Sequence, residues 1–186
     1  MVKRKMNTRS RLKISGVFGA LALMVAAPAI VPAAHAEVSA PALSVTEAAN
    51  MPTPLPYPYN ESADAMAEVD AALARAQESN KRVLIDLGGN WCGWCRLLAG
   101  VMELPEMAPF MAEHFELVTV DVSSASGKID RNLDVPARFG VEEIGGVPWM
   151  IVLAPDGTVL HSSYEVTDEN HEEPQEMADW LASWAR

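Results

Sequence analysis

The residues of this chain best suited to chemistry are two cysteines separated by two residues, Cys92 and Cys95. The sequence contains no other cysteine. A pair with this spacing can close a small disulfide that is easier to reduce than a relaxed structural one. The spacing therefore predicts reversible thiol–disulfide chemistry. The main alternative is an inert structural disulfide, which would close so short a loop that it would add little stability.

Two other uses of a cysteine pair fit this sequence poorly. A zinc site needs four ligands, and beyond the cysteines the histidines are His35, His114, His161 and His171. Covalent haem attachment needs a histidine directly after the second cysteine, where this chain has Arg96. The sequence therefore predicts neither a metal nor a cofactor.

The flanking sequence places the pair where a strand gives way to a helix. Residues 83–87 form a short, nearly all apolar run, typical of a buried strand, and helical composition runs from Arg96 to about Glu103. Cys92 then falls at or before the first helical turn, where free N–H groups and the helix dipole stabilise a thiolate. This position favours Cys92 as the nucleophile.

One carboxylate, Asp86, interrupts the apolar strand and lies six residues before Cys92. A carboxylate in a dry strand has a raised pKa, which suits a group that exchanges protons near neutral pH. The alternative is an exposed aspartate at a strand edge. The residues alone leave both possibilities open.

Helical and strand patterns alternate through the rest of the chain. Their order is helix, strand, helix, strand, short helix, β-hairpin and helix, which predicts an α/β fold with a central mixed β-sheet flanked by helices. Ser62 can cap the first helix. The predicted helices cover 62–79, 96–103, a piece reaching about 113, 136–141 and a last one starting near 173, and the predicted strands cover 83–87, 115–122, 147–153 and 158–162.

The run Trp91-Cys92-Gly93-Trp94-Cys95 resembles the active site of the thioredoxin superfamily. The resemblance covers roughly residues 62–184 and implies a thioredoxin fold. It also implies that the first cysteine attacks a substrate disulfide. The second then resolves the mixed disulfide after losing its proton toward the buried aspartate.

Two later features resemble the same family. Val147-Pro148 opens a strand as the family's cis-proline does, and Pro155-Asp156-Gly157 resembles its hairpin turn. A cis bond would expose the Val147 backbone for pairing with a substrate strand. The resemblance thus implies substrate-contacting roles for Trp91, Gly93, Trp94, Val147 and Pro148.

The chain also departs from the family pattern. Trp94 replaces the family's common proline, Gly100 stands where thioredoxins usually have a helix-kinking proline, and Trp149 stands where thioredoxin has threonine. No lysine lies on the strand 115–122 to pair with the buried aspartate. Trp91 is expected to cover the disulfide at the surface, with a core position as the alternative. The departures indicate a distinct exported branch with a Trp-Cys-x-Trp-Cys centre.

The N-terminal sequence predicts export. Residues 1–13 carry six basic and no acidic side chains, and an uncharged stretch, 14–34, follows, which is signal-peptide architecture. Ala34-His35-Ala36 fits the small-x-small pattern that signal peptidase reads. We therefore expect cleavage after residue 36 and a periplasmic location in a bacterium. The alternative is an uncleaved membrane anchor.

Composition limits what the exported part can bind. Without residues 1–36, eight basic and 25 acidic residues remain, a net charge of −17, which disfavours nucleic acid and anionic membranes. Residues 37–60 are rich in Ala and Pro, and the prolines at every second position of 52–58 exclude a helix or a central strand there. We expect a linker that holds one domain, residues 61–186, away from the N-terminus. The alternative is docking through Tyr57 and Tyr59.

Together these features predict a thiol–disulfide oxidoreductase that reduces disulfides of exported proteins. Strongly oxidising members of the fold have a histidine between their cysteines, whereas this chain has Gly93 and Trp94 there. A reductant in an oxidising compartment must be recharged, so the resemblance implies a membrane thiol–disulfide electron donor, with cytochrome c maturation as one destination. The alternatives are a disulfide oxidase or isomerase, and a non-catalytic binding module with a permanent disulfide.

Overall fold

The computed structural model describes residues 38–123, 126–168 and 171–186, all within one compact unit. The expected signal peptide and its cleavage site lie outside the described residues. Within those three ranges, no helix combines the length and the apolar character needed to cross a membrane.

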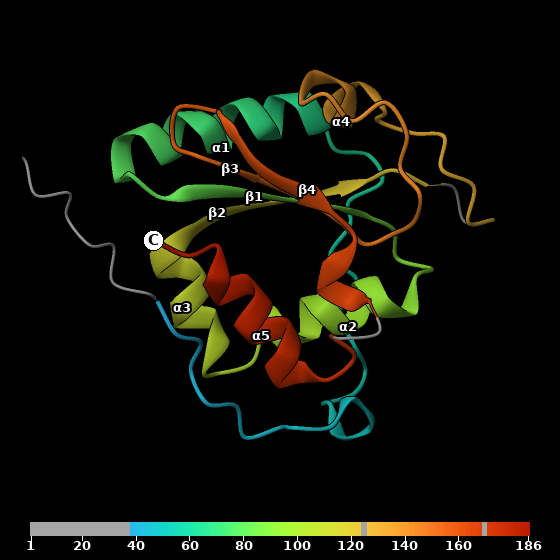
Figure 1. The fold of residues 1–186 in the computed structure, drawn as a ribbon. Helices are drawn as coiled ribbons and strands as arrows, with labels where there is room; N and C mark the ends of the chain where they lie inside the picture. Colours follow the sequence, from blue (N-terminus) through green and yellow to red (C-terminus); the bar gives the residue numbers. More distant parts are fainter. Residues whose placement is uncertain (1–37, 124–125, 169–170) are drawn as a thin grey trace, which may run out of the picture. The chain divides into compact units, whose positions relative to one another are not determined.

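A mixed β-sheet of four strands forms the centre of the described unit (Figure 1). The strands are β1 (Arg82–Gly88), β2 (Phe115–Asp121), β3 (Trp149–Leu153) and β4 (Val159–Ser163). Their order across the sheet is β2-β1-β3-β4. β1 and β2 run parallel, whereas β3 is antiparallel to both β1 and β4. The predicted mixed sheet and its C-terminal hairpin are confirmed.

Helices cover both faces of this sheet. They are α1 (Ala65–Ser79), α2 (Gly93–Met102), α3 (Met107–His114), α4 (Asp134–Arg138) and α5 (Pro174–Ser183), with 3₁₀ turns at Ala48–Asn50 and Glu165–Thr167. α1 and α4 lie on one face, and α2, α3 and α5 lie on the other (Figure 1). The predicted α/β fold is therefore confirmed.

Strand β1 is buried on both faces, which explains its apolar run. Val83, Ile85 and Leu87 belong to the apolar cluster on the α1 side, and Leu84 belongs to the cluster that includes α2 and α5. Because side chains alternate along a strand, Asp86 lies on the same face as Leu84. The strand thus points its one carboxylate toward the side of the sheet that α2 covers.

The first helix begins differently from the sequence prediction. Asp64 caps α1 by accepting the Ala67 N–H at 3.1 Å. The Ser62 hydroxyl instead donates to the Asn60 side chain at 2.9 Å. The prediction of Ser62 as the cap is wrong, because the helix begins only at Ala65 and Asp64, an equally good capping residue, directly precedes it.

Residues 38–60 do not form the expected spacer. They run along the side of the domain formed by α3, α5 and α2 (Figure 1) and bury Leu43, Met51 and Tyr59. The prediction of a linker that holds the domain away is wrong. The alternating prolines of residues 52–58 do exclude an α-helix there, but an extended chain can still pack, and this one carries apolar side chains at the points of contact.

Hydrogen bonds from two side chains at the start of α5 hold the first part of this segment. The Leu43 N–H donates to Gln175 Oε1 at 2.9 Å, and the Ala48 N–H donates to Glu173 Oε2 at 2.7 Å. An extended segment without strand neighbours needs such acceptors for its N–H groups. The segment is therefore built into the domain.

The second part of the segment, residues 51–59, is called the strap below. Arg96 of α2 donates from Nε to the Pro56 carbonyl at 2.9 Å and from Nη2 to the Leu55 carbonyl at 2.8 Å. A Cβ atom at Gly100 would lie 3.0 Å from the Met51 methyl carbon of the strap. Glycine at this position of α2 therefore lets the strap approach the helix closely.

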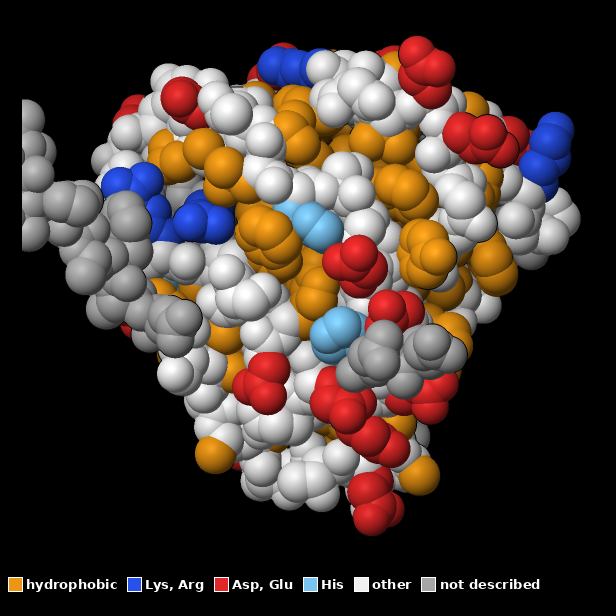
Figure 2. All heavy atoms as spheres, viewed as in Figure 1, with side chains coloured by type: hydrophobic (Ala, Val, Ile, Leu, Met, Phe, Trp, Pro, Cys, Tyr) orange, Lys and Arg blue, Asp and Glu red, His pale blue; other side chains and the backbone are white. Residues whose placement is uncertain are grey.

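The face of the molecule drawn in Figure 2 carries acidic side chains across its lower part, over the region of α5, while basic side chains lie at its margins. The acidic residues of the α5 region include Glu172, Glu173, Glu176 and Asp179. Such a surface repels polyanions.

Candidate active site

The two cysteines form a disulfide at the start of α2, with their Cα atoms 5.3 Å apart. Cys92 is the N-cap residue, and its sulfur accepts the Cys95 N–H at 3.1 Å. This N–H is one of the free donors at the helix N-terminus, and it would stabilise a Cys92 thiolate after reduction. The structure thus places Cys92 where the sequence predicts it.

Solvent exposure distinguishes the two sulfurs. Cys92 keeps 5% of its surface exposed, whereas Cys95 is fully buried. A substrate disulfide can therefore reach Cys92 and not Cys95. The predicted order, attack by Cys92 and resolution by Cys95, fits this difference.

The Val147-Pro148 segment borders the disulfide. Its peptide bond is cis, and the Val147 carbonyl oxygen lies 3.6 Å from the Cys92 sulfur. β3 begins only at Trp149, two residues later than predicted, so Val147 has no strand partner within the sheet. Its backbone is therefore placed beside the reactive sulfur, as substrate pairing would need.

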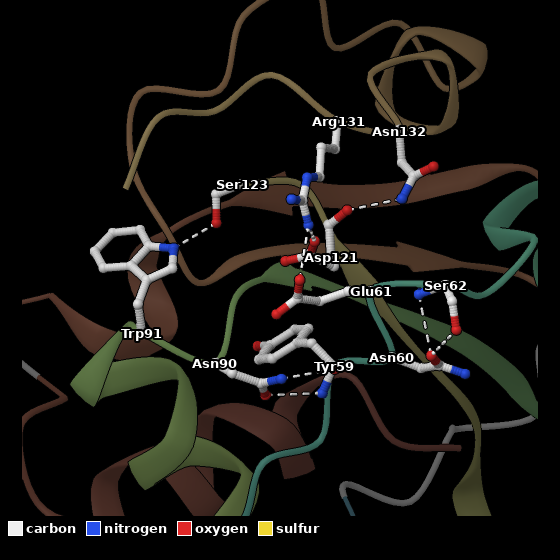
Figure 3. Close-up of polar contacts among 10 residues, drawn as sticks. All are labelled: Tyr59, Asn60, Glu61, Ser62, Asn90, Trp91, Asp121, Ser123, Arg131 and Asn132. Carbon is white, nitrogen blue, oxygen red and sulfur yellow. Dashed lines mark hydrogen bonds and ion pairs between the residues drawn. The ribbon is translucent and has the colours of Figure 1, made fainter. Parts of the chain in front are cut away.

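Two tryptophans flank the disulfide at the surface. Trp91 is 47% exposed and Trp94 is 42% exposed. The Trp91 indole N–H donates to the Ser123 hydroxyl at 2.5 Å (Figure 3), which fixes its ring beside the site. Gly93 has open space where a side chain would be. These residues form an apolar surface that a substrate can contact.

Asp86 is fully buried, and its partner comes from the strap. The Tyr59 hydroxyl lies 2.9 Å from each oxygen of the Asp86 carboxylate and donates to it. Burial raises the pKa of the Asp86 carboxyl to about 7, although the hydrogen bond from Tyr59 lowers it. Tyr59 also packs in one buried cluster with Cys92 and Cys95. The structure therefore joins the carboxylate to the cysteine pair through this tyrosine.

A second buried carboxylate lies near Tyr59. Asp121, at the end of β2, is 3% exposed and accepts a hydrogen bond from Arg131 Nη1 at 2.8 Å (Figure 3). The same Arg131 nitrogen lies 3.1 Å from Glu61. Arg131 thus balances the charge of Asp121, so that Asp86 is the buried carboxylate without a basic partner.

Comparison with known proteins identifies the family. A family model described as Thioredoxin-like matches residues 64–155. The thioredoxin of Alicyclobacillus acidocaldarius subsp. acidocaldarius is 34% identical over 79 residues, which cover 42% of this chain and 67% of that protein. The chain belongs to the thioredoxin-like family. The thioredoxin of Bacillus subtilis (strain 168) is 33% identical over 88 residues, covering 47% of this chain and 72% of that protein.

A solved structure extends the likeness beyond the family match. The crystal structure of a disulphide isomerase from Xylella fastidiosa Temecula1 has a TM-score of 0.61 and 32% sequence identity. The similarity covers 69% of this chain and 96% of that one. With the cysteine pair closed at the start of α2, this thioredoxin-like protein is a thiol–disulfide oxidoreductase, as the sequence predicts.

Sequence reasoning missed Tyr59 as the hydrogen-bond partner of Asp86. The sequence shows that no lysine on β2 can pair with Asp86, and Thr119 is the β2 residue in register with it. The Thr119 hydroxyl instead donates to the Pro58 carbonyl of the strap at 2.9 Å. Two features of the sequence could have pointed to Tyr59. It is a hydroxyl-bearing residue that directly follows a proline-rich run, and β2 has no lysine to pair with Asp86.

In the part of the chain that the structure describes, no three His, Cys, Asp or Glu side chains lie close enough together to bind a metal ion. The absence of a metal and of a cofactor stays a prediction. The roles assigned to single site residues likewise stay predictions, which the experiments below test.

Proposed function

We propose that this oxidoreductase reduces disulfide bonds of exported proteins. The observation that carries the proposal is the surroundings of the Cys92 sulfur. Among described residues, it accepts one hydrogen bond, from the Cys95 N–H, and otherwise lies against the Val147 carbonyl oxygen. A carbonyl oxygen does not stabilise a thiolate. Because strongly oxidising pairs owe their potential to a strongly stabilised reduced form, these surroundings favour a reductant.

The proposed cycle moves two electrons from the protein to its substrate. The Cys92 thiolate attacks a substrate disulfide, so that a mixed disulfide forms and one substrate sulfur leaves as a thiolate. Cys95 then passes its proton to Asp86 and attacks the Cys92 sulfur. The Cys92–Cys95 disulfide forms, and the second substrate sulfur leaves as a thiolate that takes up a proton from water.

The basic and apolar N-terminal sequence supports a periplasmic location after cleavage at residue 36. In that compartment a dithiol donor, most simply a membrane protein with its own cysteine pair, must reduce the disulfide again. N-terminal sequencing of protein from the periplasmic fraction tests the location. Glu37 as the first residue is expected, and intact protein confined to the cytoplasm would refute it.

The reduction potential of the Cys92–Cys95 pair tests the direction of electron flow. The protein is equilibrated with glutathione or dithiothreitol buffers, and the fluorescence of the flanking Trp91 and Trp94 reports the redox state. A potential between about −270 and −220 mV is expected for a reductant. A value near about −120 mV would instead identify an oxidase. A pair that mild reductants never open would indicate a binding module.

The similarity to the Xylella fastidiosa isomerase supports a second candidate, disulfide isomerisation. An isomerase needs attack by Cys92 but no net oxidation of the pair. The reduced protein and its Cys95→Ser variant are therefore compared in refolding a substrate with scrambled disulfides. Full activity of the variant would favour isomerisation, whereas loss of turnover favours reduction.

A further inference from the structure

The strap holds Tyr59 against Asp86 from several sides. The Asn90 side chain accepts the Tyr59 N–H at 3.1 Å and donates to the Tyr59 carbonyl at 2.7 Å (Figure 3). A Cβ atom at Gly88 would lie only 2.5 Å from the Tyr59 Cζ atom, and closer still to its hydroxyl. The end of β1 is therefore shaped to admit this phenol. Apolar packing of an N-terminal segment alone would require neither the two hydrogen bonds with Asn90 nor the space at Gly88.

The Asp86 carboxylate has little else around it that could control its charge. Within the described ranges, Tyr59 alone hydrogen-bonds to it. The β3 residue in register with it is the apolar Met150, and the charged residue of α2, Arg96, is bound to the Pro56 and Leu55 carbonyls of the strap. From β2, Asp121 acts on Tyr59, but Arg131 pairs with that carboxylate. Tyr59 is thus the polar group placed to influence protonation of Asp86.

We propose that Tyr59 is a positioning residue for the transfer of the Cys95 proton to Asp86. The inference rests on the proposed dithiol–disulfide cycle, in which Asp86 must be ionised before Cys95 can be deprotonated. A donated hydrogen bond stabilises a carboxylate relative to the neutral acid. Tyr59 therefore keeps Asp86 available as a base at neutral pH. It keeps its own proton throughout, since burial and the adjacent Asp86 raise the pKa of its hydroxyl.

The strap thereby supplies the residue that keeps Asp86 ionised at the active site. A strap docked by Arg96 delivers the hydroxyl to a carboxylate that no other described side chain reaches by hydrogen bond. The glycines at 88 and 100 both leave room for this segment. Substrate reduction and the seating of residues 51–59 are therefore coupled in this protein.

A two-step reaction with 5,5′-dithiobis(2-nitrobenzoate) tests the inference on the full-length reduced protein. Attack by Cys92 releases one thionitrobenzoate, and attack by Cys95 on the resulting mixed disulfide releases the second. Stopped-flow absorbance measures both rates between about pH 5 and pH 9. The second rate depends on ionised Asp86, so its pH midpoint reports the protonation of that carboxyl.

The variant Tyr59→Phe removes only the hydroxyl. A hydrogen bond to a charged group of ordinary strength corresponds to a rise of about one to two pH units in the midpoint of the second step. At pH values below the wild-type midpoint, the second step of the variant is expected to be about tenfold or more slower than that of the wild type. The first step should keep its pH profile, which also shows that the variant is folded. Tyr57→Phe is the matched control, because Tyr57 is 66% exposed and lies on Arg96.

Two further variants separate positioning from structural support. In an Asp86→Asn background, Tyr59→Phe should change neither step, because the carboxylate through which it acts is gone. Gly88→Ala, which displaces the phenol, should reproduce the shift. A midpoint unchanged by Tyr59→Phe, or a change that persists without Asp86, would overturn the inference. A wild-type protein that never releases the second thionitrobenzoate would refute the proposed cycle itself.

Discussion

Replacing Asp86 with asparagine should stabilise the oxidised protein at neutral and alkaline pH. The carboxyl is fully buried, and burial raises its pKa from an ordinary value of 3.8 to about 7. The difference between these two values corresponds to about 4 kcal/mol of unfolding free energy. Asparagine has nearly the same shape, stays neutral, and can still accept the Tyr59 hydrogen bond.

The sign of the effect follows from proton binding. The folded protein binds the Asp86 proton more tightly than the unfolded chain, so this group stabilises the fold fully only below about pH 4. That contribution is lost as the pH rises toward 7, because the folded protein must then either hold a proton or bury a charge. The difference between the Asp86→Asn variant and the wild type should therefore be near zero at pH 4. It should approach about 4 kcal/mol at pH 8.

Urea denaturation of both oxidised proteins at intervals from about pH 4 to pH 8 measures this difference. Asp134→Asn is the control, because Asp134 lies exposed on α4 and its replacement should leave the pH dependence of the wild type unchanged. A variant no more stable than the wild type at pH 8 would refute the reasoning. So would a stabilisation that does not grow with pH, because it would owe nothing to the buried charge.

Three further predictions test the site and the strap. Cys95→Ser should trap mixed disulfides with substrates through Cys92, and Cys92→Ser should trap none; equal trapping on non-reducing gels would contradict the assigned roles. Gly88→Ala should destabilise the protein by about 1–3 kcal/mol by crowding Tyr59, as thermal denaturation can show, while Gly146→Ala, with open space around it, should not. Met51→Ala should cost about 2–5 kcal/mol in urea denaturation, since Met51 is buried against the core. Exposed Thr46 gives the control Thr46→Ala, and equal stability of the two variants would mean that the segment does not pack.

The sequence reveals those features of the fold that depend on local pattern. The run 83–87 is apolar on both faces except at Asp86, and β1 extends beyond it by only one residue at each end. The position of the cysteine pair at a helix start could be predicted, because a strand pattern ends just before it and helical composition begins just after it. Asp86 could be predicted as buried for the same reason. In each case, the chemistry of neighbouring residues determines the answer.

The strap shows where such reasoning stops. Alternating prolines exclude a helix or a central strand, but they do not say whether the extended chain meets anything. The groups that receive it, Arg96 and Asn90, are ordinary polar residues until the fold brings them beside the strap. Nothing in the linear sequence likewise indicates that Gly88 lies against Tyr59 or that Gly100 lies against Met51. Long-range complementarity of this kind can be recognised only in three dimensions.

The N-terminal segment also imposes an order on folding during synthesis. The hydrogen bond from Tyr59 to Asp86 joins residues only 27 positions apart, and it can form as soon as β1 has been made. The bonds from Leu43 to Gln175 and from Ala48 to Glu173 span 132 and 125 positions. Because the chain grows from its N-terminus, Leu43 has no partner on α5 until the last helix emerges. The first part of the domain to be synthesised is therefore among the last to be completed.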